Sequence, residues 1–391
     1  MPERTPYRDL ALMLLASRGA LLLVGLLAAS LLGSGLTVQR GNLVYHEAAW
    51  LPLEIWARWD SEWYLLIASE GYAATDRFEG LAVNYEPEAA AGFLPLYPLL
   101  IRALSPVTGG VGAGVLISGV CLAGSLVLLY RLVRHESAAA PLGHRAGLTA
   151  CAALLVYPHS LFLSAVYPES LFLLLSLALF AFARSGRFAL AGAAGALASL
   201  TRPFGVLLVL PMLAEWWAQR HGRPEGRGRP GGWAWAWTLA IPAALAGFMI
   251  YCGRLFGDPM ALFHRQERWR GAMSGPWRAF ARWWEAGPAP HGAHGSTLEL
   301  ITALALLAMV PAMIRRLRAS YALYATITLL LPLCSTLWSY GRLACTVFPA
   351  FMLIGVAAAE GRARLPLAYA VAASTLSGLL MALYASWWWA G

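Results

Sequence analysis

Apolar runs long enough to cross a membrane recur along most of the chain. A transmembrane helix needs roughly 20 predominantly apolar residues, and the pattern predicts about eleven spans, some of them short. Two neighbouring runs meet at Arg202-Pro203, where proline removes a backbone donor and breaks a helix, so they form either two spans or one bent element. The predicted spans are residues 10–38, 111–133, 147–165, 168–183, 188–201, 203–218, 233–256, 297–314, 320–338, 343–359 and 366–388. The pattern indicates an all-α polytopic membrane protein, and nothing in it divides residues 1–391 into more than one domain.

Arginine marks one face of this predicted membrane protein. With the N-terminus in the cytoplasm, every cytoplasmic segment is basic, as the positive-inside rule requires. The opposite face has two long loops: 39–110, with nine acids against four arginines, and 257–296. Its tight turns at 166–170, 200–205 and 339–342 carry further polar groups, so we expect an extracytoplasmic site. The cytoplasmic arginines are Arg4, Arg8, Arg131, Arg134, Arg145, Arg184, Arg187, Arg220, Arg223, Arg227, Arg229, Arg315, Arg316, Arg318, Arg362 and Arg364.

Composition supports a membrane protein and excludes several other classes. The chain is 59% hydrophobic and 13% charged, whereas soluble domains carry about 25% charged residues. All its basic residues are arginine, which in a Gly-rich chain suggests a GC-rich bacterium and hence a bacterial plasma membrane. These arginines are scattered between apolar segments, so topology and lipid headgroups explain the net charge of +9 better than a nucleic acid does. No nucleotide-binding glycine motif or metal-ligand spacing is present. We therefore predict no cofactor and no metal, although loop 39–110 has enough acids for a divalent cation.

The stretch "RWDSEWYLLIASEGY" (58–72) places acids at the head of an aromatic helix. On a helix, Trp56, Asp60 and Trp63 share a face. Asp60 is then partly desolvated against aromatic surface, which suits a general base. The alternative is a helix cap, because "DSEW" before an apolar run is a good capping sequence. Glu62 lies about 200° around the helix from Asp60 and can pair with the preceding Arg58.

Three further polar residues lie at the heads of spans on the same predicted face. Glu169, in "VYPESLFLLLSLALF" (166–180), is either a second acid beside Asp60 or a residue stabilised by the helix dipole. Arg202 and Arg342 lie near membrane depth, where an arginine is costly and usually functional. An anionic headgroup, most simply a phosphate, would compensate both arginines, and the alternative is snorkelling to lipid headgroups.

Two loop segments complete the candidate chemistry. "GFLPLYPLLIRAL" (92–104) has two prolines in an apolar stretch too short to span, which indicates a broken or re-entrant segment at the interface that could floor a lipid-binding groove. "FGDPMALFHRQERW" (256–269) combines a turn at Asp258 with an amphipathic stretch. A helix cap and an interfacial helix explain it equally well. We interpret His291 and His294 as solvated rather than as metal ligands.

Several of these motifs, in order, resemble those of one enzyme family. "RWDSEWYLLIASEGY", "FLPLYPLL", "LFLSAVYPESLFLLLSL", "LASLTRPFGVLL", "FGDPMALF" and "RLACTVFPAF" run from about residue 55 to 352. They resemble the class V phosphatidylinositol-glycan mannosyltransferases, the family of GPI mannosyltransferase 2, including its bacterial relatives. The resemblance implies a fold of the glycosyltransferase C (GT-C) type, with an interfacial helix in the first outside loop. It also implies a catalytic Asp at Asp60, a companion acid at Glu169 and the family's Arg at Arg202. Eukaryotic members have Glu-His-Phe where this chain has Glu62-Trp63-Tyr64, which puts a His-assisted step in doubt.

These observations predict a membrane glycosyltransferase. The resemblance implies that mannose, or a similar hexose, moves with inversion from a polyprenyl-phosphate donor in the membrane to a hydroxyl of a glycolipid, glycan or protein acceptor. Asp60 would be the base. The alternative is a lipid flippase or transporter without transferase activity, which would predict inverted repeats and ionisable residues at the membrane midplane; we see neither in the sequence. Candidate phosphate-binding residues are Arg202, Arg342, Arg265 and Arg268, and candidate substrate-binding residues are Glu62, Trp59, Trp63, Tyr64, Tyr167, Asp258, Gln266 and Tyr340.

Overall fold

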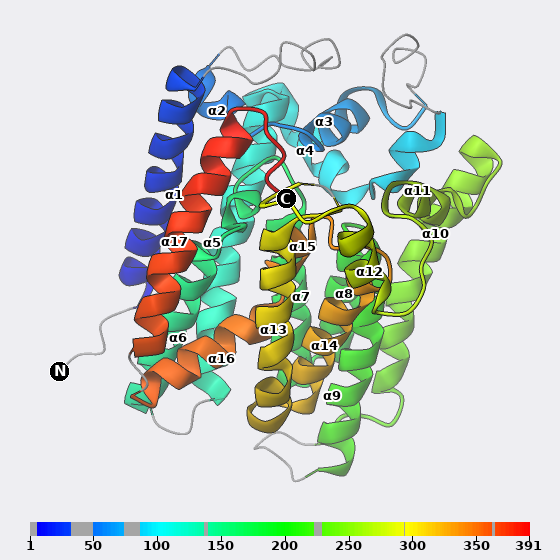
Figure 1. Cartoon of the computed structure of the whole chain (residues 1–391). Coiled ribbons are helices and arrows are strands. Elements are labelled where there is room, and N and C mark those ends of the chain that lie inside the picture. The colour runs from blue at the N-terminus through cyan, green and yellow to red at the C-terminus, as the bar shows by residue number, and fades with distance from the viewer. Residues whose placement is uncertain are drawn as a thin grey trace.

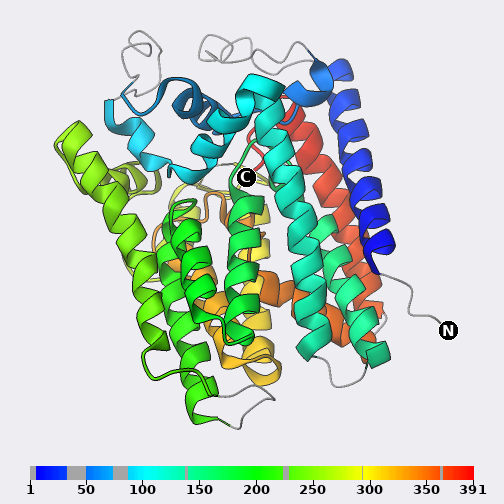
Figure 2. The same cartoon turned by 180° about the vertical axis from the view of Figure 1, so that it is seen from behind.

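Long helices that run between two ends of the molecule make up most of the chain (Figures 1 and 2). The computed structural model describes residues 6–32, 50–73, 87–136, 140–222, 229–292, 294–361 and 364–391. The α-helices are α1 (Pro6–Leu31), α2 (Leu51–Glu54), α3 (Ser61–Glu70), α4 (Leu96–Thr108), α5 (Gly110–Glu136), α6 (Ala140–Val156), α7 (Glu169–Arg184), α8 (Phe188–Ser199), α9 (Val209–His221), α10 (Ala240–Phe256), α11 (Ala261–Arg270), α12 (Arg278–Glu285), α13 (Thr297–Arg316), α14 (Ala319–Leu333), α15 (Tyr340–Ala344), α16 (Phe348–Ala359) and α17 (Arg364–Ala385). The 3-10 helices are η3 (Pro87–Gly92), η4 (Ser160–Leu163), η5 (Pro203–Leu208) and η6 (Ala234–Leu239).

Each predicted apolar run coincides with a helix, which confirms the all-α membrane fold. Among the described residues, five helices are long and apolar enough to cross a membrane: Pro6–Leu31, Gly110–Glu136, Ala234–Phe256, Thr297–Arg316 and Leu367–Ala385. Shorter apolar helices lie between them, and the number of spans stays a prediction. The proposed break at Arg202-Pro203 is present, because α8 ends at Ser199 and the chain continues into η5. Arg4, Arg223, Arg227, Arg362 and part of loop 39–110 lie outside the described residues.

The two ends of the helix bundle differ in character. Helices α2, α3, α4 and α11, all from the two long loops predicted on the outside, gather at the upper end in Figure 1. Helix α13 runs down from this region and carries Arg315 and Arg316 in its last turn, at the lower end. The structure therefore separates the two classes of loop as the sequence pattern predicts.

A buried ion-pair network holds the helices together near their lower ends. The Glu215 side chain, 1% exposed, pairs with Arg184 over 3.3 Å and with Arg318 over 3.2 Å, and accepts a hydrogen bond from Ser320. Arg184 also pairs with Glu136 over 2.8 Å. Because each charge has a partner, the desolvation cost of burying it is offset. This network joins α5, α7, α9 and α14, so its role is structural.

An arginine within α1 anchors this helix to the η4 region. The Arg18 guanidinium donates to the backbone oxygens of Leu155 and Ser160 over 2.7 and 2.8 Å, and to the hydroxyls of Ser160 and Ser164. Backbone oxygens freed where α6 ends are satisfied in this way, as buried polar groups must be. The sequence analysis missed this ionisable residue within a span, because only the fold shows what it contacts.

Two local predictions about the upper end were wrong. A continuous helix through residues 56–67 is not formed: α2 ends at Glu54, and Trp59 has a left-handed φ of 59° before α3 begins at Ser61. Residues 92–104 are also not broken between their prolines, since α4 runs uninterrupted from Leu96 to Thr108. Pro95 precedes that helix and Pro98 lies in its first turn, where a missing N–H is tolerated.

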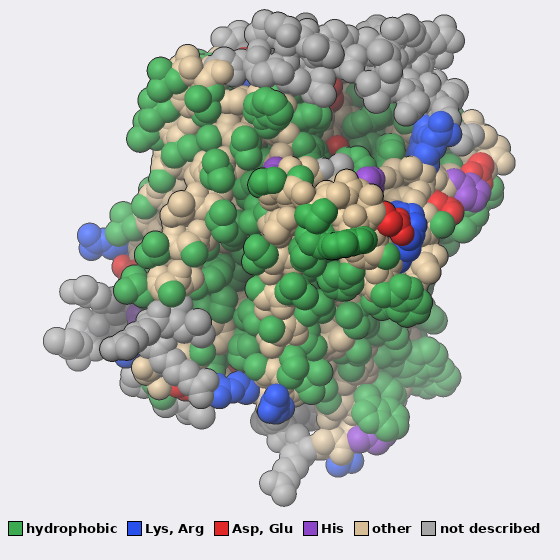
Figure 3. Space-filling view, viewed as in Figure 1, with side chains coloured by type: hydrophobic (Ala, Val, Ile, Leu, Met, Phe, Trp, Pro, Cys, Tyr) green, Lys and Arg blue, Asp and Glu red, His purple; other side chains and the backbone are tan. Residues whose placement is uncertain are grey.

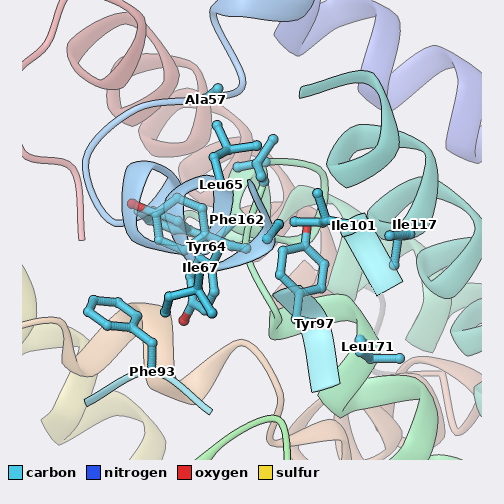
Figure 4. Close-up of a cluster of buried hydrophobic side chains, with 14 of the residues drawn as sticks. Ala57, Tyr64, Leu65, Ile67, Phe93, Tyr97, Ile101, Ile117, Phe162 and Leu171 are labelled. Carbon is cyan, nitrogen blue, oxygen red and sulfur yellow. The ribbon is translucent and has the colours of Figure 1, made fainter. Parts of the chain in front are cut away.

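A buried aromatic and aliphatic cluster lies beneath α3 (Figure 4). The Tyr64 ring meets Phe93, Tyr97 and Tyr167 edge-on, with centroids 5.1, 5.4 and 6.2 Å away. Aromatic pairs at these distances add about 0.5–1.5 kcal/mol beyond the area they bury. The cluster provides the rigid support on which the polar residues of the upper end are positioned.

Candidate active site

Four charged residues, from four distant parts of the chain, form one connected group near the upper end. The Arg342 Nη1 donates to Asp60 Oδ2 over 2.7 Å, and its Nε lies 3.5 Å from Glu169 Oε1. Arg202 Nη1 donates to the same Glu169 oxygen over 2.8 Å. Acid and arginine therefore alternate along the group, in the order Asp60, Arg342, Glu169 and Arg202. The space-filling view shows acidic side chains within a hollow just below this end (Figure 3).

The two acids of this group differ in accessibility. The Asp60 side chain is 28% exposed, whereas that of Glu169 is 1% exposed. One Glu169 oxygen lies between two arginines, and the other is buried with no hydrogen-bond partner among the described residues. Of these two acids, Asp60 is thus the accessible one, and Glu169 is in contact with both arginines.

The conformation of the chain around Asp60 explains its position. The left-handed turn at Trp59 lets the chain enter α3 with Asp60 at the N-cap position. The Asp60 side chain nevertheless makes no capping hydrogen bond, and it faces Arg342 instead. Its backbone N–H donates to the Tyr167 hydroxyl, which donates to the Arg58 backbone oxygen. Tyr167, fully buried, therefore holds the Asp60 backbone in place.

Glu169 and Arg202 are both fixed by an adjacent proline. Pro168 precedes α7, whose first residue is Glu169, so the carboxylate lies at the positive end of the helix dipole. Arg202 is extended, with φ −147° and ψ 143°, as expected for a residue before proline. In this extended conformation the chain leaves the helix at Arg202, and the Arg202 side chain points toward α7.

Arg342 is enclosed by aromatic rings and held by the residue before it. The guanidinium lies 5.6, 5.3 and 5.5 Å from the ring centroids of Phe162, Tyr167 and Trp389. Cation–π contact in a desolvated site is worth up to about 2 kcal/mol. The preceding Gly341 donates its N–H to the buried Glu299 carboxylate, which fixes the start of this short helix.

A buried histidine supports the same glycine. His159 Nε2 lies 3.1 Å from Glu299 Oε1, and the Tyr157 hydroxyl donates to the Gly341 backbone oxygen over 3.0 Å. A Cβ added at Gly341 would overlap the His159 ring, so only glycine fits there. None of His159, Glu299 and Tyr157 was predicted from the sequence, since they act on the group through Gly341.

A third arginine, also missed by the sequence analysis, lies close to the group. Burial, together with the nearby charges of Arg342 and Arg202, lowers the pKa of Arg270 to about 9. Its guanidinium donates to the backbone oxygen of Trp338 over 3.0 Å. Three arginines and two acids thus lie near one another, and the net positive charge of this set favours an anion.

The other predicted residues of loop 257–296 contact their own helix or neighbouring segments. Asp258 accepts from the Met260 N–H over 2.8 Å and pairs with exposed His264 over 2.7 Å, so it caps the turn into α11. Gln266 donates to the Gly92 backbone oxygen over 3.1 Å. Buried Arg265 lies over the Trp269 ring, whereas Arg268 is exposed.

The remaining aromatic candidates are part of the packing around the site. Trp63 stacks on Phe93 at 5.3 Å. The buried Tyr340 hydroxyl donates to the Leu329 backbone oxygen over 3.1 Å. Tyr64 and Tyr167 are buried in the cluster of Figure 4 or beside it, whereas Trp59 adjoins Asp60 and remains partly exposed.

Glu62 and Asp60 lie in different environments, as their spacing along the sequence suggests. Burial raises the pKa of the Glu62 carboxyl to about 8, and the charge of Arg58 opposes this rise. Arg58 forms an ion pair with Glu54 over 3.1 Å, and its charge also acts on Glu62. In the described part of the chain, no cluster of three or more His, Cys, Asp or Glu is arranged to hold a metal ion.

Comparisons with known proteins place this arrangement in context. A model of the family "Mannosyltransferase (PIG-V)" matches residues 35–213, which confirms the resemblance to the class V phosphatidylinositol-glycan mannosyltransferases. That stretch includes Asp60, Glu169 and Arg202 but not Arg342 or Arg270. A search of curated proteins found no match. The family match supports a membrane glycosyltransferase.

Solved structures share the fold at low sequence identity. ArnT from Cupriavidus metallidurans, bound to undecaprenyl phosphate, is 15% identical with a TM-score of 0.52, and the match covers 82% of this chain and 62% of ArnT. The oligosaccharyltransferase AglB from Archaeoglobus fulgidus, in complex with an inhibitory peptide and a dolichol-phosphate, is 11% identical with a TM-score of 0.44, covering 95% of this chain and 56% of that one. The ArnT likeness supports the GT-C fold, and this chain spans less than two thirds of either protein.

Proposed function

Because the chain matches the mannosyltransferase (PIG-V) family over residues 35–213, we propose that it transfers mannose, or a similar hexose, from a polyprenyl-phosphate donor to an acceptor hydroxyl. The acceptor is a glycolipid, glycan or protein on the extracytoplasmic side of a bacterial plasma membrane, with the N-terminus in the cytoplasm. The observation that carries the proposal is the accessible Asp60 carboxylate bonded to Arg342, within an arginine group that favours an anion.

Asp60 is the general base in this proposal. It accepts the proton of the acceptor hydroxyl while that oxygen bonds to the anomeric carbon of the donor sugar. The bond from that carbon to the phosphate oxygen breaks, and its electron pair leaves with the prenyl phosphate. Attack opposite the leaving group inverts the anomeric centre. General base catalysis of this kind is worth about 10²–10⁴-fold in rate.

The arginines bind the donor phosphate in this scheme. Arg342, Arg202 and Arg270 offer several N–H donors, and guanidinium groups recognise phosphate through paired, charge-assisted hydrogen bonds. These groups also stabilise the charge that develops on the leaving phosphate. Glu169 is buried between Arg342 and Arg202, so it positions the arginines rather than touching the acceptor. We retain Arg265 and Arg268 only as outer candidates.

Donor binding would also activate the base. In the free enzyme Arg342 Nη1 donates to Asp60 Oδ2 over 2.7 Å, so this carboxylate oxygen is already engaged. A donor phosphate competes for the same guanidinium. Once Arg342 turns to the phosphate, Asp60 has a freer oxygen for the acceptor hydroxyl, so proton transfer is coupled to the presence of donor.

The prenyl chain of the donor needs an apolar route to this group. Helix α4 exposes Leu99, Leu104 and Val107, whereas Tyr97 and Ile101 are buried against the core. An amphipathic helix of this kind suits the membrane interface. The ArnT structure named above was determined with undecaprenyl phosphate, which supports a lipid phosphate as the donor of this chain too.

The test is transfer by the purified protein. Radiolabelled polyprenyl-phosphate mannose is incubated with wild-type protein and membrane lipids, and labelled product is separated from donor. We expect transfer by wild type and a loss of about 10²–10⁴-fold in Asp60→Asn. Glu285→Gln is the matched control, because Glu285 is an exposed acid of α12 paired with Arg278. Movement of the carrier across vesicles without transfer would favour a flippase.

A further inference from the structure

The segment after α17 returns into the candidate active site. Trp389 lies with its ring centroid 5.5 Å from the Arg342 guanidinium, and its backbone oxygen lies 2.8 Å from His291 Nε2. Ala390 is fully buried, and Gly391 lies against Phe162 and the Arg342 side chain. Residues 386–391 are therefore part of the site rather than a loose extension of the helix.

Three tryptophans from distant segments meet there. The Trp389 ring is edge-on to Trp59, with centroids 5.5 Å apart, and to Trp338, with centroids 6.2 Å apart. All three rings are partly exposed. Each indole N–H, however, is buried and has no hydrogen-bond partner among the described residues. Unpaired buried donors are uncommon in folded proteins, and here three of them occur in one cluster.

The backbone is held in an unfavourable conformation at the same place. In the described part of the chain, the residues other than glycine with positive φ are Trp59 at 59°, Ser339 at 61° and Trp387 at 65°. Trp59 is a member of the cluster, Ser339 follows Trp338, and the Trp387 ring lies 6.4 Å from Trp59. Such conformations persist where surrounding structure enforces them and concentrate at functional sites.

The tryptophan cluster also lies between the proposed base and the arginines of the proposed phosphate site. Trp59 immediately precedes Asp60, the proposed base, and Trp389 covers Arg342. Trp338 is joined through its backbone oxygen to Arg270, the third arginine. A sugar whose anomeric carbon is near Asp60 and whose phosphate is on the arginines would have its ring beside these indoles.

We propose that Trp59, Trp338 and Trp389 form the subsite for the hexose ring of the donor, an inference that rests on the function proposed above. Indole faces pack against the C–H faces of a hexose, and indole N–H groups donate to its hydroxyls. The prenyl chain is a poor occupant, because it has no acceptor for the three donors. Since the N–H groups are shielded in the free protein, the rings rotate slightly as the sugar enters.

The adjacent Trp388 provides a matched control. It belongs to the same segment and has the same chemistry, yet it is 56% exposed, and in the described part of the chain its ring has no ring contact with the cluster. Trp389→Phe keeps an aromatic ring while removing the N–H, and Trp388→Phe makes the identical change outside the subsite. Trp338→Phe is a second subsite variant, useful if Trp389→Phe unfolds in detergent.

The experiment measures binding of two probes, mannosyl phosphoprenol and the corresponding bare prenyl phosphate, by titration calorimetry in detergent. We expect Trp389→Phe and Trp338→Phe to weaken binding of the mannosyl probe by about three- to tenfold, the effect of one lost hydrogen bond. These two variants should bind the bare prenyl phosphate as tightly as wild type does. Trp388→Phe should bind both probes as tightly as wild type does. Tryptophan fluorescence should change when wild type binds the mannosyl probe, and change less with the bare phosphate.

Each other result is informative. If the variants weaken both probes equally, the tryptophans support the phosphate group and the subsite is overturned, while the proposed function stands. If neither probe loses affinity in the variants, the subsite is likewise overturned. If wild type binds neither probe, the lipid-phosphate donor itself is wrong, and the inference falls with the proposed function.

Discussion

The two carboxylates that contact Arg342 should respond in opposite ways to the loss of their charge. Asp60→Asn and Glu169→Gln each replace one acid by an amide of the same shape. We expect Asp60→Asn to remove transfer while leaving stability nearly unchanged. Glu169→Gln should instead destabilise the folded protein, and any transfer it loses should follow from displaced arginines.

The expected cost in stability of each substitution follows from how deeply the carboxylate is buried. The Asp60 side chain is 28% exposed, and Arg342 keeps its contact with Glu169 when the Asp60 charge is removed. The loss of this partly exposed partner should therefore cost only about 0–1 kcal/mol. Glu169 is 1% exposed and contacts two arginines. Removing one partner of a buried pair costs about 3–5 kcal/mol, because the remaining charge is left uncompensated. Loss of a general base, by contrast, costs about 10²–10⁴-fold in rate.

The assay pairs thermal unfolding in detergent with initial rates of transfer from mannosyl phosphoprenol, measured on the same preparations. Arg202→Gln provides a further comparison, since it removes the other side of the Glu169 pair. The reasoning would be refuted if Asp60→Asn unfolded at as low a temperature as Glu169→Gln. It would also be refuted if Glu169→Gln kept wild-type stability.

Four further predictions concern the surroundings of this group. Arg270→Gln should raise the KM for the donor about tenfold or more, by loss of a charge-assisted phosphate contact, whereas Arg278→Gln, an exposed arginine of α12, should leave donor titrations unchanged. Gly341→Ala should lower kcat, because a Cβ at residue 341 overlaps the His159 ring and displaces the neighbouring Arg342. A wild-type rate would show that the close approach of Gly341 to His159 is not needed for transfer. Arg18→Leu should lower the free energy of unfolding by about 1–3 kcal/mol, since it leaves buried carbonyl oxygens around η4 unpaired. Identical melting curves for the variant and wild type would contradict the anchoring role of Arg18. Glu62 has a pKa of about 8 in the folded protein, against an ordinary value of 4.5, so the folded protein holds a proton that the unfolded chain releases. The free energy of unfolding should therefore fall as pH rises from about 5 to 8. In melting temperatures recorded against pH, Glu62→Gln should flatten that slope.

Much of the fold could be predicted from the sequence because helices in a membrane have a strong local signal. The apolar runs located the long helices, and Arg202-Pro203 marked a real break. Arginine in the lower loops and acids in the upper ones identified the end where the polar group lies. These properties depend on a few neighbouring residues, so a single sequence shows them.

The internal contacts of the site depend on the fold and could be predicted only in part. Asp60 and Arg342 were singled out separately, yet their 2.7 Å contact joins residues far apart in the chain. The left-handed turn at Trp59 was missed, because nothing local favours positive φ in a tryptophan. Arg270 was overlooked in favour of Arg265 and Arg268, since on one amphipathic helix only the packing decides which arginine faces the group.

Two other contributors act through partners that the sequence does not reveal. Arg18 was hidden within an apolar run, and its hydrogen bonds to η4 appear only when α1 packs beside that break. A run of tryptophans such as 387–389 is typical of a membrane interface. In the structure Trp387 and Trp389 turn inward, toward Arg58 and Arg342.

The most direct test of the central claim is a structure of the Asp60→Asn protein with bound mannosyl phosphoprenol, determined by electron cryomicroscopy in lipid nanodiscs. The account predicts that the phosphate contacts Arg342, Arg202 and Arg270, that the hexose lies against the tryptophans, and that its anomeric carbon faces residue 60. A donor phosphate bound at the opposite end of the helix bundle, or away from all three arginines, would contradict it.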